Sequence, residues 1–235
     1  MRRNLTCAGA AWIAFGLALS VARGADNVPP AGFVALFNGQ DLTGWKGLVG
    51  DGNPVKRAGM SPDELAANQK AADEDMRAHW KPENGVLVFD GKGKSLCTAK
   101  DYGDFELLVD WKIEKDGDSG IYLRGTPQVQ IWDPDCKPCL DSAGIGSGGL
   151  YNNKDNPSRP TVKADKPIGQ WNSFAIKMVG DKVTVKVNGQ LVVDAVPLEN
   201  FWEPGKPMYP SGDIELQNHG NSLYFKNIYI KELPR

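Results

Sequence analysis

The sequence predicts an all-β protein, built as an antiparallel β-sandwich with one helical insertion. From Gly85 onward, short runs alternate apolar and polar residues, which is the pattern of strands with one buried face. Turn signals rich in Gly, Pro, Asn and Asp separate these runs, and Asn188-Gly189 is typical of a tight hairpin. With no internal repeat and no second domain boundary, we expect one domain over residues 25–235.

Residues 1–24 have the three-part pattern of a secretory signal peptide. Arg2 and Arg3 are followed by an apolar run and then by small residues at Ala22 and Gly24. The run is shorter than the roughly 20 apolar residues that cross a membrane. We therefore expect export to the periplasm or the extracellular space, with no membrane span after signal removal; a retained N-terminal anchor is the alternative.

Composition limits the partners of the chain. The net charge is −2 and acidic and basic residues are mixed throughout, so neither nucleic acid nor an anionic membrane surface is an expected partner. Cys97, Cys136 and Cys139 follow the predicted signal peptide, and an odd count allows one bridge at most plus a free thiol. Cys136 and Cys139 could form a local disulfide or remain as two thiols.

The helical insertion is predicted over residues 61–80. Ser61 is a helix cap, Pro62 suits the first helical position, and a glutamate follows three residues after the cap. We expect Leu65, Met76 and several alanines on its buried side. Residues 50–60 before it are rich in Gly, Pro and basic residues and are predicted to form a loop.

The remaining segments are predicted to be strands, apart from a long loop over 133–170 of the kind that carries function. In chain order, the expected strands cover residues 32–37, 86–89, 105–113, 121–124, 128–132, 174–178, 183–187, 191–193, 212–220 and 223–230.

Three strands carry unusual polar faces. In the strand over 212–220, apolar residues alternate with Asp213, Glu215, Gln217 and His219. The strands over 121–124 and 128–132 repeat this mixture of planar polar groups and aromatic rings. Their side chains on that face are Tyr122, Arg124, Gln128, Gln130 and Trp132. Such groups recognise sugars through paired hydrogen bonds and ring stacking. The alternative is an ordinary solvated sheet face.

Strand geometry limits how these groups can cooperate. Glu215 and His219 stand about 13 Å apart along a straight strand, so they cannot form a directly bonded pair. His219 suits proton transfer, because an imidazole can both accept and donate a proton. Its partners must come from neighbouring strands or loops, where Asp118, Asp133 and residues 152–153 are the candidates.

Four motifs together resemble the bacterial 3-keto-disaccharide hydrolase domain family. They are FVALFNGQDLTGW at 33–45, SGIYLRG at 119–125, VQIWD at 129–133 and IELQNHG at 214–220. The resemblance covers about 33–233 and implies a concanavalin A-like jelly roll, export, and action on glycosides oxidised at C3. One departure is Gln128, where many members carry Glu. The helical insertion is similar to that of a subgroup.

The resemblance implies a reaction in which a base removes the C2 proton next to the C3 ketone, the C1 substituent leaves, and water adds. On this reading His219 or Glu215 transfers protons with Asp118 as a neighbouring acid, and Arg124, with or without a divalent metal such as calcium, stabilises the oxyanion. The expected sugar contacts are Tyr122, Gln130, Trp132, Asp133, Gln217 and Asn152.

The implied partners are a carbohydrate substrate and an upstream sugar 3-dehydrogenase. Two other classes remain open at this stage, because a sandwich fold does not specify an activity. The first is a non-catalytic carbohydrate-binding module of the cell envelope. The second is a structural or interaction protein of the envelope.

Overall fold

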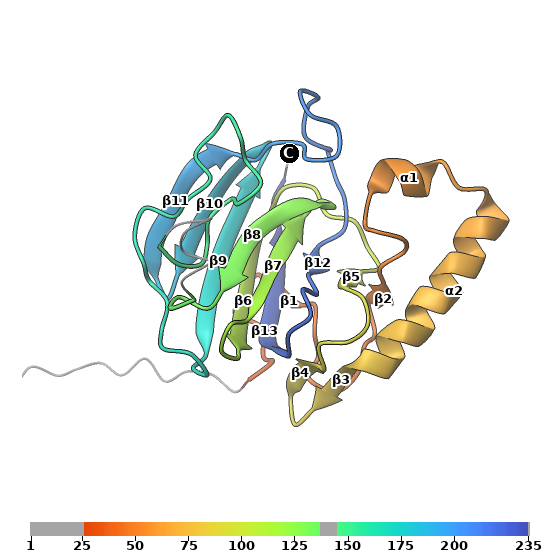
Figure 1. Cartoon of the computed structure of the whole chain (residues 1–235), viewed down its shortest axis with the longest axis horizontal. Coiled ribbons are helices and arrows are strands. Elements are labelled where there is room, and N and C mark those ends of the chain that lie inside the picture. Colours follow the sequence, from red (N-terminus) through yellow and green to blue (C-terminus); the bar gives the residue numbers. More distant parts are fainter. Residues whose placement is uncertain (1–25, 137–144, 235) are drawn as a thin grey trace, which may run out of the picture.

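The computed structural model describes residues 26–136 and 145–234 (Figure 1). The predicted signal peptide lies outside the described residues and therefore stays a prediction. So does one cysteine of the expected local pair, Cys139.

The described chain folds almost entirely into antiparallel strands. In chain order they are β1 (Val34–Ala35), β2 (Trp45–Gly47), β3 (Trp80–Glu83), β4 (Val86–Phe89), β5 (Leu96–Thr98), β6 (Phe105–Ile113), β7 (Asp118–Leu123), β8 (Thr126–Trp132), β9 (Asn172–Val179), β10 (Lys182–Val187), β11 (Gln190–Pro197), β12 (Glu215–Leu216) and β13 (Leu223–Glu232).

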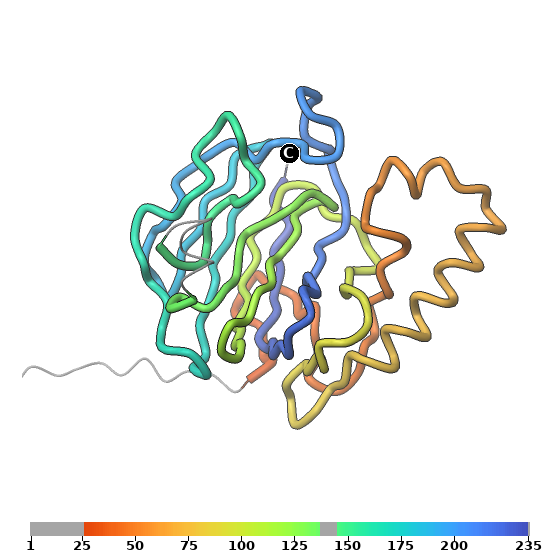
Figure 2. The backbone as a smooth tube through the Cα atoms, viewed as in Figure 1, coloured from red at the N-terminus to blue at the C-terminus, as the bar shows by residue number. Residues whose placement is uncertain are grey.

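These strands form two sheets. The larger, eight-stranded sheet has the order β11-β10-β9-β6-β13-β4-β3, with β1 paired to β13. The smaller, five-stranded sheet has the order β2-β5-β12-β7-β8. Strands far apart in the sequence are neighbours in both, and the tube in Figure 2 shows the blue C-terminal segment running among earlier strands. The predicted antiparallel sandwich is confirmed.

The apolar faces of the two sheets meet in one core. On the eight-stranded sheet, Trp80 stacks on Phe89 with ring centroids 4.5 Å apart. On the five-stranded sheet, Ile121, Ile131 and Leu216 are fully buried. Because side chains alternate along a strand, burying these residues places their polar neighbours on the outer face of the five-stranded sheet. That face is where the candidate site lies.

Two helices lie beside the sandwich rather than one: α1 (Pro54–Ala58) and α2 (Pro62–His79). The cap predicted at Ser61 is present, since its Oγ accepts a hydrogen bond from the Glu64 N–H. The loop predicted over 50–60 was wrong in part, because the Asn53 side chain accepts from two backbone N–H groups and starts α1.

The first turns of α2 are less buried than predicted. Ala72 and Met76 are buried as predicted, but Leu65 is 37% exposed. The helix meets the sheets through its C-terminal half, and its first turns project away from the sandwich (Figure 1). Leu65 therefore has no sheet to pack against.

Close packing of α2 on β2 depends on Gly47. A Cβ atom at this position would lie 2.0 Å from the carbonyl oxygen of Ala72. We expect Gly47→Ala to lower the free energy of unfolding by at least about 2 kcal/mol, because helix and strand would have to separate. Urea unfolding measures this. Gly59→Ala is the matched control, since its Cβ would lie at an ordinary 3.5 Å from the nearest atom; equal stabilities of the two variants would contradict the expectation.

Candidate functional site

The polar face of the five-stranded sheet is ordered in rows by strand pairing. Glu215 lies directly between Cys97 and Tyr122 on the two neighbouring strands, and Lys46 follows beyond Cys97. The Gln217 N–H donates to the Gly120 carbonyl, so the pairing of the two strands continues beyond β12. The expected three-strand surface is therefore present.

His219 forms an ion pair across this surface. Its Nδ1 lies 3.3 Å from Asp118 Oδ2. The other carboxylate oxygen, Oδ1, accepts from Gln130 Nε2 at 2.7 Å, and Gln130 in turn accepts from Gln128 Nε2. A histidine oriented by a partly buried carboxylate is a suitable base, because the carboxylate stabilises the imidazolium that forms.

The surroundings of Asp118 affect its charge. Burial raises the pKa of the Asp118 carboxyl above its ordinary value, while His219 and the Gln130 amide act in the opposite direction. His219 itself is 59% exposed, so its free ring nitrogen can be reached from solvent. The pair combines a hydrogen-bonded, partly buried carboxylate with an accessible imidazole.

Glu215 is the second titratable group of the face. Its side chain is 3% exposed, and burial raises its pKa to about 8. A hydrogen bond from Ser95 and the charge of Arg57 lower the pKa, and Asp213 raises it. At neutral pH this glutamic acid is therefore mostly protonated and can donate a proton.

Tyr122 and Gln217 lie on the same face. Gln217 Nε2 donates to the Tyr122 hydroxyl at 3.3 Å. Burial, and then the neighbouring Glu215, raise the pKa of Tyr122, so the phenol keeps its proton. The Oε1 atoms of Gln217 and Gln128 are buried and have no hydrogen-bond partner among the described residues. These free acceptors match the hydroxyl groups of a sugar.

An aromatic pair borders the face beyond β8. Trp132 and Tyr151 pack edge to face with centroids 5.5 Å apart, and Trp132 Nε1 donates to the Gly146 carbonyl. Trp132 is almost fully buried, whereas Tyr151 is 40% exposed. Tyr151 is thus the more accessible ring, and no strand pattern or motif in the sequence marked it.

Arg124 lies at the end of β7 and is used differently from the expectation. Its backbone has a φ of 55°. Its guanidinium donates to the Gly103, Gly180 and Tyr209 carbonyls and to Asp104. The side chain is only 3% exposed. It holds three loops together, and the structure does not bring it beside Glu215 or His219, so the expected oxyanion role has no geometric support.

We expect Arg124→Met to lower the free energy of unfolding by about 3–5 kcal/mol, because three carbonyl groups lose their donor and Asp104 loses its ion pair. The folded fraction should keep its activity on a 3-keto-glucoside. Urea unfolding together with initial rates checks both statements. Normal stability combined with lost activity would instead show that Arg124 takes part in the reaction.

Two other candidates are also placed elsewhere. The Asp133 carboxylate accepts from the backbone N–H groups of Asp116 and Asp135, both at 2.8 Å, and so stabilises turns. Asn152 lines a separate cavity of about 310 Å³ together with Glu199. Loop residues do not follow strand alternation, which is why their direction could not be read from the sequence.

Three further residues join the face at the Glu215 end. Arg57 Nη1 lies 3.1 Å from Asp213 Oδ2, and Lys46 Nζ lies 3.9 Å from the same oxygen. Asp213 shares the alternation of Glu215, which was a usable signal. No signal in the sequence pointed to Arg57, because it lies in α1, within the segment predicted as a loop.

The cysteines agree with one bridge plus a free thiol. Cys97 is free and buried beside Glu215, and Cys136 is disulfide-bonded. Within residues 26–136 and 145–234, no three His, Cys, Asp or Glu side chains are grouped as a metal site. The possible calcium ion therefore stays a prediction, and we derive no step through it.

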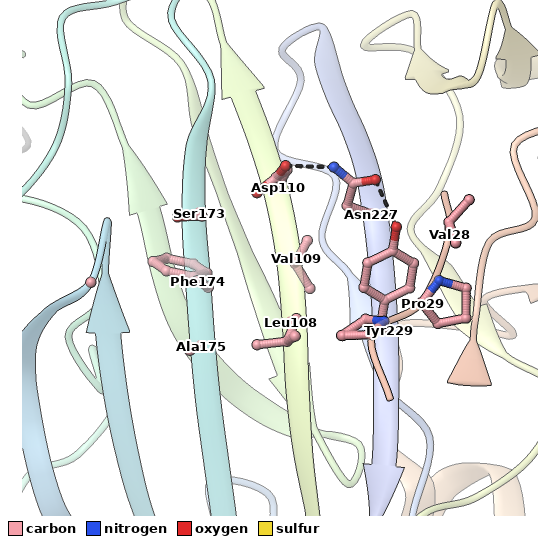
Figure 3. Close-up of a pocket in the computed structure, with 12 residues that line it drawn as sticks. Val28, Pro29, Leu108, Val109, Asp110, Ser173, Phe174, Ala175, Asn227 and Tyr229 are labelled. Atoms are coloured by element: carbon pink, nitrogen blue, oxygen red, sulfur yellow. Dashed lines mark hydrogen bonds between the residues drawn. The ribbon is translucent and has the colours of Figure 1, made fainter. Parts of the chain in front are cut away.

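A larger cavity, of about 590 Å³, lies on the opposite sheet, against β6, β9 and β13 (Figure 3). Its polar groups bond to one another: the Tyr229 hydroxyl donates to Asn227, and Asn227 donates to Asp110 (Figure 3). Groups already satisfied in this way are less suited to binding a ligand than the unpaired acceptors of the five-stranded sheet. The candidate site is therefore assigned to the five-stranded sheet.

Residues 32–231 match the model of the 3-keto-alpha-glucoside-1,2-lyase-like domain. The chain belongs to this family. The curated relative named 3-keto-disaccharide hydrolase, from Bacteroides thetaiotaomicron, is 24% identical over 253 residues, covering 86% of this chain and 79% of the relative. The resemblance found in the motifs is confirmed.

Two crystal structures of other proteins are similar to this chain. A protein from Parabacteroides distasonis provisionally named a glycosyl hydrolase is 26% identical, with a TM-score of 0.65, over 89% of this chain and 100% of that chain. Another structure of that name and organism is 25% identical, with a TM-score of 0.61, over 87% and 85% of the two chains.

In the described part of the chain, neither helix has the length and apolar character to cross a membrane.

Proposed function

We propose that this protein cleaves glycosides whose sugar carries a ketone at C3, and that it does so by proton abstraction at C2. The observation that carries the proposal is the His219–Asp118 pair on the same strand face as the buried Glu215. Family membership and the name of the Bacteroides relative support a substrate of this class.

In the first step, His219 takes the C2 proton, which the adjacent ketone makes acidic. The electrons of the C2–H bond form the enolate, whose negative charge lies on the C3 oxygen. We assign Tyr122 as the donor to this oxygen, because its own oxygen accepts from Gln217 and its phenol remains protonated.

In the second step, the enolate expels the C1 substituent and Glu215 protonates the departing oxygen. A double bond then joins C1 and C2 beside the restored ketone. Water adds its hydroxyl to C1 and gives its proton to Glu215, and His219 returns a proton to C2. Both residues recover their starting states, and the net reaction is hydrolysis.

Turnover of two matched substrates tests the proposal. Purified protein is incubated with methyl 3-keto-α-glucoside and with the parent methyl α-glucoside, and methanol release is followed. We expect release from the keto compound alone, since only its C2–H is acidified. Tight binding of the unmodified sugar without turnover of either compound would instead support the carbohydrate-binding module.

We further propose export to the periplasm or the extracellular space, on the basis of residues 1–24. N-terminal sequencing of the protein from its native host tests this, and an intact Met1 would contradict it. The substrate also requires a dehydrogenase that oxidises the sugar at C3. Loss of keto-sugar formation after removal of such an activity from the host would support this partner.

A further inference from the structure

The carboxylate of Asp118 is bonded to Gln130 through the oxygen that does not face His219. Gln130 is 2% exposed, and its Nε2 donates to Asp118 Oδ1 at 2.7 Å. The same nitrogen lies 3.0 Å from the Ser119 carbonyl oxygen and 3.2 Å from that of Ile131. All three neighbours are acceptors, so only the NH2 group of the amide can face them. The direction of this side chain is therefore fixed.

Gln128 fixes the amide of Gln130 from the other end. Because the NH2 group of Gln130 faces Asp118, its Oε1 faces Gln128, whose Nε2 donates to it. Gln128 is 5% exposed. A Cβ atom at Gly120, the residue paired with Gln130 on β7, would lie 2.7 Å from Gln128 Oε1. The missing side chain at Gly120 therefore leaves the Gln128 amide its place beside Gln130.

The orientation of Asp118 determines which ring nitrogen of His219 is free. An ionised carboxylate can only accept, so Asp118 Oδ2, at 3.3 Å from Nδ1, favours the tautomer of His219 with its hydrogen on Nδ1. The other nitrogen, Nε2, then keeps the lone pair that the proposed reaction needs for the C2 proton. Without the hydrogen bond from Gln130, the carboxylate could rotate and would select this tautomer less strongly.

We infer that Gln130 is a positioning residue, which holds Asp118 in the orientation that selects the Nδ1–H tautomer of His219. Gln128 supports it by fixing the direction of its amide. The inference rests on the proposed function, and it replaces the sugar contact expected of Gln130 from the sequence. The two roles differ in a measurable way, since a sugar contact would not depend on the presence of Asp118.

Nitrogen-15 NMR of the imidazole rings tests the tautomer without any substrate. The chain has only two histidines, so a His79→Gln background leaves the ring signals of His219 alone. At a pH where the ring is neutral, we expect the Nδ1–H tautomer in this background. Adding Gln130→Met should give a mixture with the Nε2–H tautomer. An Nε2–H ring before this change, or an unchanged ring after it, would overturn the inference.

Rates on methyl 3-keto-α-glucoside give the second measurement. We expect Gln130→Met to lower kcat about tenfold with KM unchanged, the low end of the value of a hydrogen bond to a charged group. Gln128→Met acts one step further from His219 and should lower kcat about twofold to fivefold. In protein that already carries Asp118→Ala, Gln130→Met should cause no further loss, because no carboxylate is left to position.

Thr126→Val is the matched control. Thr126 lies on β8 like both glutamines, is fully buried, and has a hydroxyl without a hydrogen-bond partner among the described residues. This variant should keep the tautomer and the kcat of the wild type. A full tenfold loss from Gln130→Met in the Asp118→Ala protein would show a direct sugar contact and contradict the inference, while the proposed function stands. If the wild type does not turn over the keto substrate, the proposed function fails, and the NMR result still decides the tautomer.

Discussion

His219→Ala should lower kcat on methyl 3-keto-α-glucoside about 10²-fold to 10⁴-fold, the usual contribution of a positioned general base. The fold should be unaffected, because the side chain is 59% exposed and its ion pair with Asp118 lies at the surface of the sheet. Initial rates and urea unfolding measure the two quantities. Added imidazole should restore part of the rate, which a merely structural role would not allow.

Asp118→Asn is the companion change. It keeps the size of the side chain and a carbonyl oxygen for Gln130, but removes the negative charge beside His219. We expect a loss in kcat of at least about tenfold, smaller than that of His219→Ala, with little change in KM. Near-normal rates in both variants would show that the pair has no part in proton transfer.

Glu215→Gln should also lower kcat/KM at least about 100-fold, because the amide cannot protonate the departing oxygen. In the wild type, kcat/KM should fall as the pH rises through about 8, where the Glu215 carboxyl ionises. The residual activity of Glu215→Gln should lack this decline. The pH dependence of kcat/KM for both proteins checks this, and an identical decline in the two would assign it to another group.

The same residue should make stability depend on pH. The pKa of Glu215 is raised from 4.5 in the unfolded chain to about 8 in the folded protein, so between these values the folded state holds one more proton. Its contribution is full below pH 4.5 and is lost as the pH rises through about 8. The free energy of unfolding should fall by up to about 1.4 kcal/mol per pH unit in this window.

Glutamine does not titrate, so Glu215→Gln removes this pH dependence. The difference in unfolding free energy between wild type and variant therefore isolates the contribution of Glu215. Urea unfolding at several pH values between 5 and 8 gives this difference. We expect the free energy of unfolding of the variant, relative to that of the wild type, to increase with each step to higher pH. Parallel curves would show that Glu215 is ionised in the folded protein, and its assignment as an acid would then be wrong.

Strand alternation made much of the fold predictable. The positions of Ile121 and Leu216 in the core follow from period-two patterns, and Asn188-Gly189 does join β10 to β11. The cap at Ser61 located α2 correctly. These features depend on local backbone preferences and on one buried face. Both are determined by residues that are close together in the sequence.

The site was only partly predictable, because its composition depends on which strands are neighbours. Alternation put Glu215 and His219 on one face, and the need for a partner on another strand pointed to Asp118 among others. The sequence could not show that the strand end turns Arg124 toward loops, where it bonds to Gly103 and Gly180. Nor could it show that α1 carries Arg57 to Asp213, since that contact joins segments far apart in the chain.

Solvent deuterium at C2 tests the central claim most directly. Methyl 3-keto-α-glucoside is hydrolysed in deuterated water, and the C2 position of the product is examined by proton NMR, with enzyme-free and His219→Ala samples as controls. Removal of the C2 proton by His219, followed by addition of water, predicts deuterium at C2 of the product at the rate of hydrolysis. Hydrolysis that leaves the original C2 hydrogen in place would contradict the account.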